Sequence, residues 1–207
     1  HLSQSSMVAV MTRSATNHSL DAARAWDAAA AVPDPEVPCV NVAELGILRD
    51  VAIEDGVAVA YVTPTYSGCP AVLAIELAIE AALLDAGFEA RIERVMSPAW
   101  TTDWITPEGC EKLRAYGIAP PVRGSNSKMA LFGETVINGP RCVSAETQKV
   151  SEFGSTACKA HYTCKACAEP FDYFKCICGY HNGAGPISRT DGHRRPAANR
   201  QGNGHPL

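Results

Sequence analysis

VAVAYVTPTYSGCPAVLAIELAIEAALLDA, residues 57–86, decides the fold of the first part of this chain. Residues 57–63 predict a strand, and residues 70–86 predict an apolar helix with proline in its first turn. Cys69 then lies at the helix N-cap, where free backbone N–H groups and the helix dipole favour the thiolate and lower the thiol pKa. We expect an ionised sulfur here, either a metal ligand or a nucleophile. The alternative is a small cysteine that only fills space.

The segments on either side extend this stretch into a small sheet. Residues 47–53 and 57–63 predict a hairpin, because Asp55–Gly56 between them supplies a turn with positive φ. Residues 88–95 alternate apolar and charged side chains, as a half-buried strand does. With a helix over residues 20–32, the order α-β-β-α-β indicates an α+β fold, a small mixed sheet with helices on one face.

Composition excludes several classes of protein. The chain has 207 residues, is 46% hydrophobic and 19% charged, and carries a net charge of −4, which gives no electrostatic reason to expect nucleic acid as a partner. No apolar run reaches the ~20 residues that cross a bilayer. Residues 1–20 lack a hydrophobic stretch of signal-peptide length. We therefore expect a cytoplasmic protein with no membrane or nucleic-acid partner.

The nine cysteines are unevenly distributed, with six of them between residues 142 and 178. In a reducing compartment, clustered cysteines indicate metal or redox chemistry. GPRC (139–142) and CKAC (164–167) resemble the two turns of a zinc ribbon, except that Gly139 replaces the first cysteine. Cys142, Cys164 and Cys167 are the expected ligands of a structural zinc ion. The candidates for a fourth ligand are Cys158 and Cys176, with Cys178, His161 and His181 as further choices. The alternative is a degenerate ribbon whose thiols bind no metal.

These features give the expected organisation of the chain. A unit of about 50 residues has too small a core to be stable without a staple such as zinc. The predicted parts are a disordered N-terminal tail (1–19), an α+β domain (20–119), a linker (120–128), a zinc-ribbon-like domain (129–181) and a disordered tail (182–207).

A second polar cluster follows the first helix. Asp34 and Glu36 flank Pro35, where they could be capping or solvated groups. If the sheet brings this loop beside Cys69, two carboxylates and a sulfur converge. That combination suits a transiently bound iron better than a nucleophile. No histidine lies near Cys69 in the sequence to act as a general base, which weakens covalent catalysis.

Two tryptophans, Trp100 and Trp104, lie in a predicted loop. Such residues often fill the core, but they also dominate the hot spots of protein interfaces. We take them as candidate partner-binding residues.

Five stretches together carry a resemblance to a known family: DPEVPCVNVAELGILRDV (34–51), TPTYSGCP (63–70), PAWTTDWITPEG (98–109), YGIAPP (116–121) and EFGSTACKAHYTCKACAEPFDYFKC (152–176). The chain resembles the D subunit (PaaD) of the phenylacetyl-CoA epoxidase complex, also called the phenylacetate-CoA oxygenase J subunit. Its first part resembles the SufT-like iron–sulfur assembly domains.

The resemblance implies a role in aerobic phenylacetate degradation. There a di-iron oxygenase epoxidises the aromatic ring of the CoA thioester, and a reductase with a flavin and a [2Fe–2S] cluster supplies electrons. The PaaD component is expected to assist the maturation of an iron–sulfur or iron centre in these partners, above all the reductase. The assembly-family signature falls on Asp34, Glu36, Thr63 and Cys69, and the zinc ribbon on Cys142, Cys164 and Cys167.

The residues agree with this accessory role. The chain has neither the Glu-x-x-His pairs of a di-iron bundle nor a glycine-rich dinucleotide loop. We therefore expect no catalysis by the chain alone. The competing hypotheses are a docking subunit whose ribbon binds other subunits, and an enzyme that uses the Cys69 thiolate. A homodimer is the other assembly considered.

Overall fold

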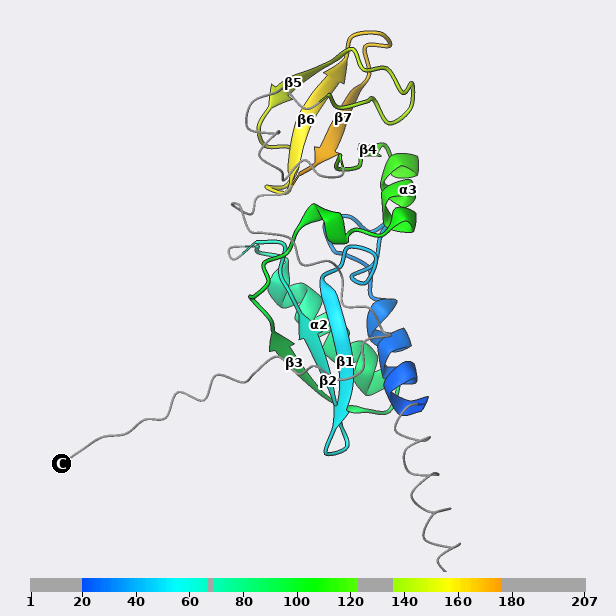
Figure 1. The fold of residues 1–207 in the computed structure, drawn as a ribbon, viewed down its shortest axis with the longest axis vertical. Coiled ribbons are helices and arrows are strands. Elements are labelled where there is room, and N and C mark those ends of the chain that lie inside the picture. The colour runs from blue at the N-terminus through cyan, green and yellow to red at the C-terminus, as the bar shows by residue number, and fades with distance from the viewer. Residues whose placement is uncertain (1–19, 67–68, 123–135, 176–207) are drawn as a thin grey trace, which may run out of the picture.

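The computed structural model describes residues 20–66, 69–122 and 136–175. The predicted tails (1–19 and 182–207), most of the predicted linker (120–128) and Cys176 lie outside the described residues. The described chain forms a lower part, with three strands and their helices, and an upper part built on β4, β5, β6 and β7 (Figure 1). The fold is α+β, as the sequence predicts.

The lower sheet has the strand order β1-β2-β3. β1 (Leu48–Glu54) and β2 (Val57–Val62) pair antiparallel through the predicted turn, in which Asp55 and Gly56 have φ of 51° and 87°. β3 (Glu89–Arg94) pairs parallel with β2. The sheet is therefore mixed, and its parallel pair needs a crossover connection.

Helix α2 (Val72–Asp85) is that crossover. In Figure 1 it lies behind the strands, with Ile75, Ile79 and Leu83 buried in the core. Residues 20–30 form a second helix, which buries Ala25 and Ala29 in the same core. The outer face of α2 is also apolar, because Leu73, Leu77 and Leu84 are more than half exposed.

Both tryptophans are buried, so the prediction that they bind a partner is wrong. Trp100 is 2% exposed and donates a hydrogen bond from Nε1 to the carbonyl of Leu45, over 2.8 Å. Trp104, at the end of the short helix η1 (Thr102–Trp104), is 3% exposed, and the Arg49 guanidinium lies 3.5 Å from its ring centre. Burying the two aromatic rings in the core stabilises the fold, and each ring has a polar or cationic neighbour there.

Helix α3 (Pro107–Tyr116) leads to the upper sheet. The Thr106 side chain caps its first turn, and Gly117, with φ of 95°, ends it. The next two residues form β4 (Ile118–Ala119), which pairs parallel with β7. The upper sheet thus takes a strand from the segment before the predicted linker.

The upper sheet has the order β4-β7-β6-β5, with β5 (Thr147–Ser151), β6 (Lys159–Cys164) and β7 (Pro170–Phe174) forming an antiparallel meander. Its own core is small. The buried members are Ala119, Ile137, Ala160, Cys164, Phe171 and Tyr173.

The two parts are packed together by residues of the upper part that enter the core of the lower one. Phe174 is 2% exposed and meets Trp100 edge to face, with ring centroids 6.3 Å apart. Cys158 belongs to the same core. This contact positions the site described below.

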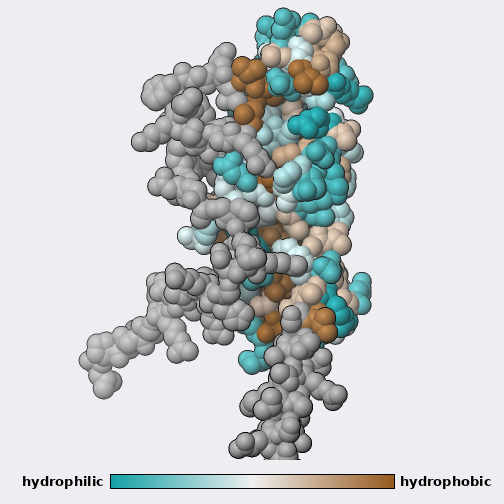
Figure 2. Space-filling view, turned by 45° about the vertical axis from the view of Figure 1, so that its right-hand side comes forward, coloured by the Kyte–Doolittle hydropathy of each residue, from teal (hydrophilic) through white to brown (hydrophobic). Residues whose placement is uncertain are grey.

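Apolar and polar side chains are both present on the surface of the described residues (Figure 2). On the face seen in Figure 2, hydrophobic side chains gather near the upper and lower ends among hydrophilic ones. Within the described residues no helix has the length and apolarity needed to span a membrane.

Candidate metal centres

A small cavity lies where the upper part meets the lower part. Its volume is about 20 Å³, room for about one water molecule or one metal ion. Asp34, Glu36, Cys69 and Cys158 line it together with aliphatic side chains and the ring of Phe174. The predicted convergence of two carboxylates and a sulfur is therefore present, and a second sulfur joins it.

Asp34 organises the acidic loop. It is 7% exposed, and its Oδ1 accepts hydrogen bonds from the backbone N–H groups of Glu36 (2.9 Å) and Val37 (2.8 Å). Burial raises the pKa of Asp34, against the opposing effects of these two N–H groups and the charge of Lys159. Asp34 thus holds the turn that presents Glu36 to the cavity.

Cys69 does not occupy the helix N-cap. The helix begins at Val72 with Ala71 as its N-cap, two residues later than predicted. The sulfur still accepts the backbone N–H of Ala71 and a hydrogen bond from Thr65. Burial nevertheless raises its pKa, and the charges of Glu36 and Asp34 raise it further. The predicted lowering of the thiol pKa is therefore wrong.

Thr63 and Tyr66 frame this turn. Thr63 follows β2 and is 1% exposed; its Oγ1 has no hydrogen-bond partner among the described residues, and it does not line the cavity. The Tyr66 side chain is hydrogen-bonded to Cys69, and burial together with the charges of Cys69 and Glu36 raises its pKa. The sequence reasoning missed Tyr66, although it lies three residues before Cys69.

Cys158 was one of the candidates for a fourth zinc ligand, and the structure places it in this cavity instead. It is 7% exposed; its sulfur donates to Glu36 Oε2 over 3.7 Å and lies 3.0 Å from Thr156 Oγ1. Burial raises its pKa to about 11; the Thr156 hydrogen bond opposes this and the Glu36 charge adds to it. No local sequence pattern could show that a residue 122 positions from Glu36 meets it.

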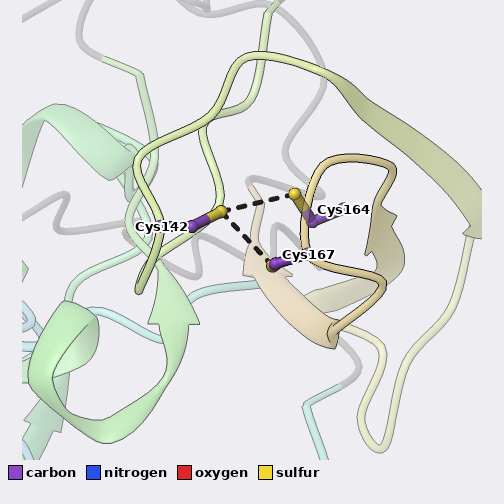
Figure 3. Close-up of side chains that lie close together, drawn as sticks. All are labelled: Cys142, Cys164 and Cys167. Carbon is purple, nitrogen blue, oxygen red and sulfur yellow. Dashed lines mark hydrogen bonds between the residues drawn. The ribbon is translucent and has the colours of Figure 1, made fainter.

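A second cluster lies at the far end of the upper sheet and contains the three predicted zinc ligands. Cys142 comes from the segment before β5, Cys164 is the last residue of β6, and Cys167 lies in the turn between β6 and β7 (Figure 3). The Cys142 sulfur is 3.3 Å from that of Cys164 and 3.4 Å from that of Cys167. All three sulfurs lie within 4.8 Å of one another, as ligands of one ion must.

The turn between Cys164 and Cys167 shifts the pKa of both thiols. The backbone N–H of Cys167 lowers the pKa of Cys164 to about 7, with further help from the Cys142 side chain. The backbone N–H of Glu169 lowers the pKa of Cys167. Hydrogen bonds with the Cys142 and Cys164 side chains outweigh this effect, so the pKa of Cys167 is raised. The Cys164 thiol is therefore partly ionised at neutral pH, and the thiolate is the form that binds metal.

The backbone at Gly139 stands at the missing fourth position. A Cβ built there lies 3.2 Å from Cys142 Sγ and 3.9 Å from Cys164 Sγ, so a side chain at this residue would point at the cluster. His161, another candidate, lies 3.3 Å from Asp172 Oδ1 instead. The three sulfurs fit a zinc ion, and a cavity of about 110 Å³ lies beside them.

Comparisons with known proteins divide the chain in the same way. The family model described as "Iron-sulfur cluster assembly protein" matches residues 23–94, and the "PaaD zinc beta ribbon domain" matches residues 124–175. A protein of Escherichia coli (strain K12), named as a putative D subunit of the 1,2-phenylacetyl-CoA epoxidase, is 47% identical over 154 residues, which are 73% of this chain and 91% of that protein.

Three similar solved structures each cover less than half of this chain. A domain of unknown function (DUF59) from Bacillus anthracis is 24% identical, with a TM-score of 0.42, over 46% of this chain and 92% of its own. A protein of Mycobacterium tuberculosis, described as associated with [Fe-S] complex assembly and repair, is 38% identical, with a TM-score of 0.27, over 46% of this chain and 84% of its own.

Proposed function

The chain belongs to the PaaD family of phenylacetyl-CoA epoxidase components, and from that premise we propose that it helps to install an iron or iron–sulfur centre in the other subunits. In this proposal it is a cytoplasmic accessory component of phenylacetate degradation. Its main partner is the reductase that carries a flavin and an iron–sulfur cluster.

One observation carries the proposal: the Cys69 thiol and the Glu36 carboxylate line a cavity with room for about one ion. A thiol with a raised pKa stays protonated at neutral pH and is a poor nucleophile. A dication displaces that proton, because metal binding requires the thiolate. Sulfur and carboxylate together suit ferrous iron held for a short time. This chemistry favours metal handling over covalent catalysis.

The four residues of the proposed transfer site have different roles. Cys69 and Glu36 are the ligands, and Asp34 holds the loop of Glu36 through its two backbone hydrogen bonds. Thr63 is buried directly after β2, and its Oγ1 has no hydrogen-bond partner among the described residues.

We also propose that the ribbon cysteines hold zinc. When bound, the ion cross-links the segment before β5 to the turn after β6, which a sheet with so small a core needs.

The experiment that tests the proposed function is co-expression of the chain with the oxygenase and reductase subunits. Replacing Cys69 by alanine should lower the iron content of the purified partners and their electron-transfer activity. Cys110→Ala, another half-buried cysteine outside the cavity, is the matched control. Partners that load iron fully beside the Cys69→Ala chain would contradict a maturation role.

Docking is the second candidate function, favoured by the outer face of α2. Leu73, Leu77 and Leu84 are 55–60% exposed on α2. The solvent-facing side of a surface helix usually carries polar side chains instead. We propose the reductase as its occupant, with a second copy of the chain as the competing outcome. Leu77→Glu should abolish co-purification with the reductase; a change in the chain's own oligomeric state instead would identify a homodimer.

A further inference from the structure

We propose that the ribbon site takes its fourth ligand from outside the chain, as the thiolate of a small molecule that also carries a carboxylate. The inference rests on the proposed zinc ion of the ribbon, because it concerns the ligand position at which Gly139 stands. It goes further in making the ribbon a binding site for a small thiol and not only a structural cross-link.

Three sulfurs and one glycine occupy the four ligand positions of the ribbon. The Cys142 sulfur lies 3.3 Å from that of Cys164 and 3.4 Å from that of Cys167, and all three lie within 4.8 Å of one another. A Cβ at Gly139 would have its three nearest atoms in Cys142 and Cys164. Because a structural zinc ion takes four ligands, one ligand has to come from another source.

The other candidates from the sequence that the structure describes lie elsewhere. His161 is 3.3 Å from Asp172 Oδ1, and the Cys158 sulfur contacts Glu36 in the lower part. Within residues 20–66, 69–122 and 136–175, no further cysteine, histidine or carboxylate joins the three sulfurs in a metal-binding group. The remaining candidates, which lie outside the described residues, are Cys176, Cys178 and His181.

The cavity beside the sulfurs has room for a small thiol. Its volume is about 110 Å³, several times what one water molecule needs. The three cysteines and Gly139 line one side of it, and Tyr116 and Gly117 at the end of α3 also line it. Cys142 and Cys167 are exposed, so a ligand can approach the sulfurs from solvent. A thiolate bound here restores the four-sulfur set that zinc ribbons use.

Arg141 gives the cavity a preference for a thiol with a carboxylate. It lines the cavity, its side chain is 67% exposed, and its Nε lies 3.1 Å from Glu169 Oε1. An exposed ion pair of this kind contributes little to stability, so the guanidinium can exchange Glu169 for another carboxylate. A guanidinium also binds a carboxylate through two parallel N–H groups.

Binding of the thiol is a simple exchange of a proton for the metal. The thiol loses its proton to solvent as its sulfur binds the ion, and no oxidant or reductant is needed. The carboxylate stays ionised and pairs with Arg141. The expected ligands are therefore small anionic thiols, of which 3-mercaptopropionate is a simple probe.

Cobalt(II) is a suitable substitute for zinc, because its absorption spectrum depends on how many thiolates bind it. The full chain, loaded with cobalt without added thiol, should show a spectrum of fewer than four sulfurs. Titration with 3-mercaptopropionate should convert it, with saturation, to a four-sulfur spectrum. The neutral thiol 2-mercaptoethanol should bind about fivefold more weakly, and Arg141→Gln should remove this difference.

Gly139→Cys is the matched control, because it should show the four-sulfur spectrum at once and respond to neither thiol. If the unchanged chain shows that spectrum before any thiol is added, the chain supplies the fourth ligand itself; the inference is then wrong and the zinc proposal stands. The same holds if neither thiol alters the spectrum, and a response to added reductase instead would assign the position to a partner's cysteine. Equal binding of the two thiols would overturn the role of Arg141. If the unchanged chain binds no cobalt at the three cysteines, both the inference and the zinc proposal are wrong.

Discussion

Replacing Gly139 by cysteine should complete the ribbon site. A Cβ at this position points at the cluster and lies 3.2 Å from Cys142 Sγ, so a thiolate one bond further on can reach a shared ion after a shift of a few tenths of an ångström. The Gly139 backbone already belongs to the turn, because its carbonyl accepts the N–H of Val143 over 3.0 Å. The substitution therefore adds a ligand without rebuilding the loop.

The expected gain in zinc affinity follows from the number of protein ligands. Loss of an outer-shell group costs about 10–100-fold in metal affinity, so a direct ligand should be worth at least about 100-fold. At a free zinc concentration that half-saturates the unchanged chain, zinc stabilises that chain by about 0.4 kcal/mol and Gly139→Cys by about 2.7 kcal/mol. The difference, about 2.3 kcal/mol, should appear in the free energy of unfolding of the upper part.

The assay is competition for zinc against a chelator, together with chemical unfolding in a zinc buffer. Gly139→Ala is the matched control, because it adds the Cβ but no sulfur; it should bind zinc no better than the unchanged chain. Equal zinc affinity in the cysteine and alanine variants would refute the reasoning that Gly139 stands at the fourth ligand position.

Three further predictions concern the cavity and the contact between the two parts. Alkylation of Cys69 by iodoacetamide should be slow at pH 7 and still accelerate above pH 9, because its pKa is raised; a rate that levels off below pH 8 would show an activated thiolate. Because the pKa of Cys158 is about 11 in the folded chain and about 8.5 in the unfolded one, the thiol favours folding below pH 8.5, and that stability is lost as the pH rises to 11. Cys158→Ala should make the decline in stability over this range shallower, by up to about 1.4 kcal/mol per pH unit, as urea unfolding would measure; an unchanged slope would contradict the raised pKa. Trp100→Ala should destabilise the chain by about 3–5 kcal/mol and separate the unfolding of the two parts, whereas a loss below about 1 kcal/mol would show that the ring does not join them.

Local patterns were enough to predict the lower part. The Asp55–Gly56 turn, the alternation of β3 and the apolar run of α2 each express a period or a backbone preference that neighbouring residues determine. The three ribbon cysteines were equally predictable, because two short turns carry the ligands. These features need no knowledge of distant contacts.

The errors arose where distant residues decide the outcome. The thiol pKa of Cys69 depends on its burial and on two carboxylates from another loop, and these outweigh the backbone N–H group that the sequence pointed to. Trp100 lies in a loop, yet Phe174, 74 positions along the chain, joins it in the core. Cys158 was one of the candidates for a fourth ribbon ligand because it lies among the ribbon cysteines in the sequence, but its side chain contacts Glu36 in the lower part.

This arrangement gives the two clusters different chemistry. The ribbon site contains a thiol with a pKa of about 7 and holds its sulfurs together, as a permanent metal site does. The cavity contains two protonated thiols beside carboxylates, so a bound metal competes with protons and is more easily given up. We therefore propose separate places in one chain for a structural ion and for a transferred ion.

A measurement of direct iron transfer tests whether the cavity around Cys69 delivers iron to the reductase. The chain, loaded anaerobically with ⁵⁷Fe²⁺, is mixed with reductase stripped of its iron, and the labelled iron in the re-isolated reductase is measured by Mössbauer spectroscopy. The cavity account predicts that the unchanged chain delivers ⁵⁷Fe and that Cys69→Ala does not. Equal delivery by both chains would contradict it.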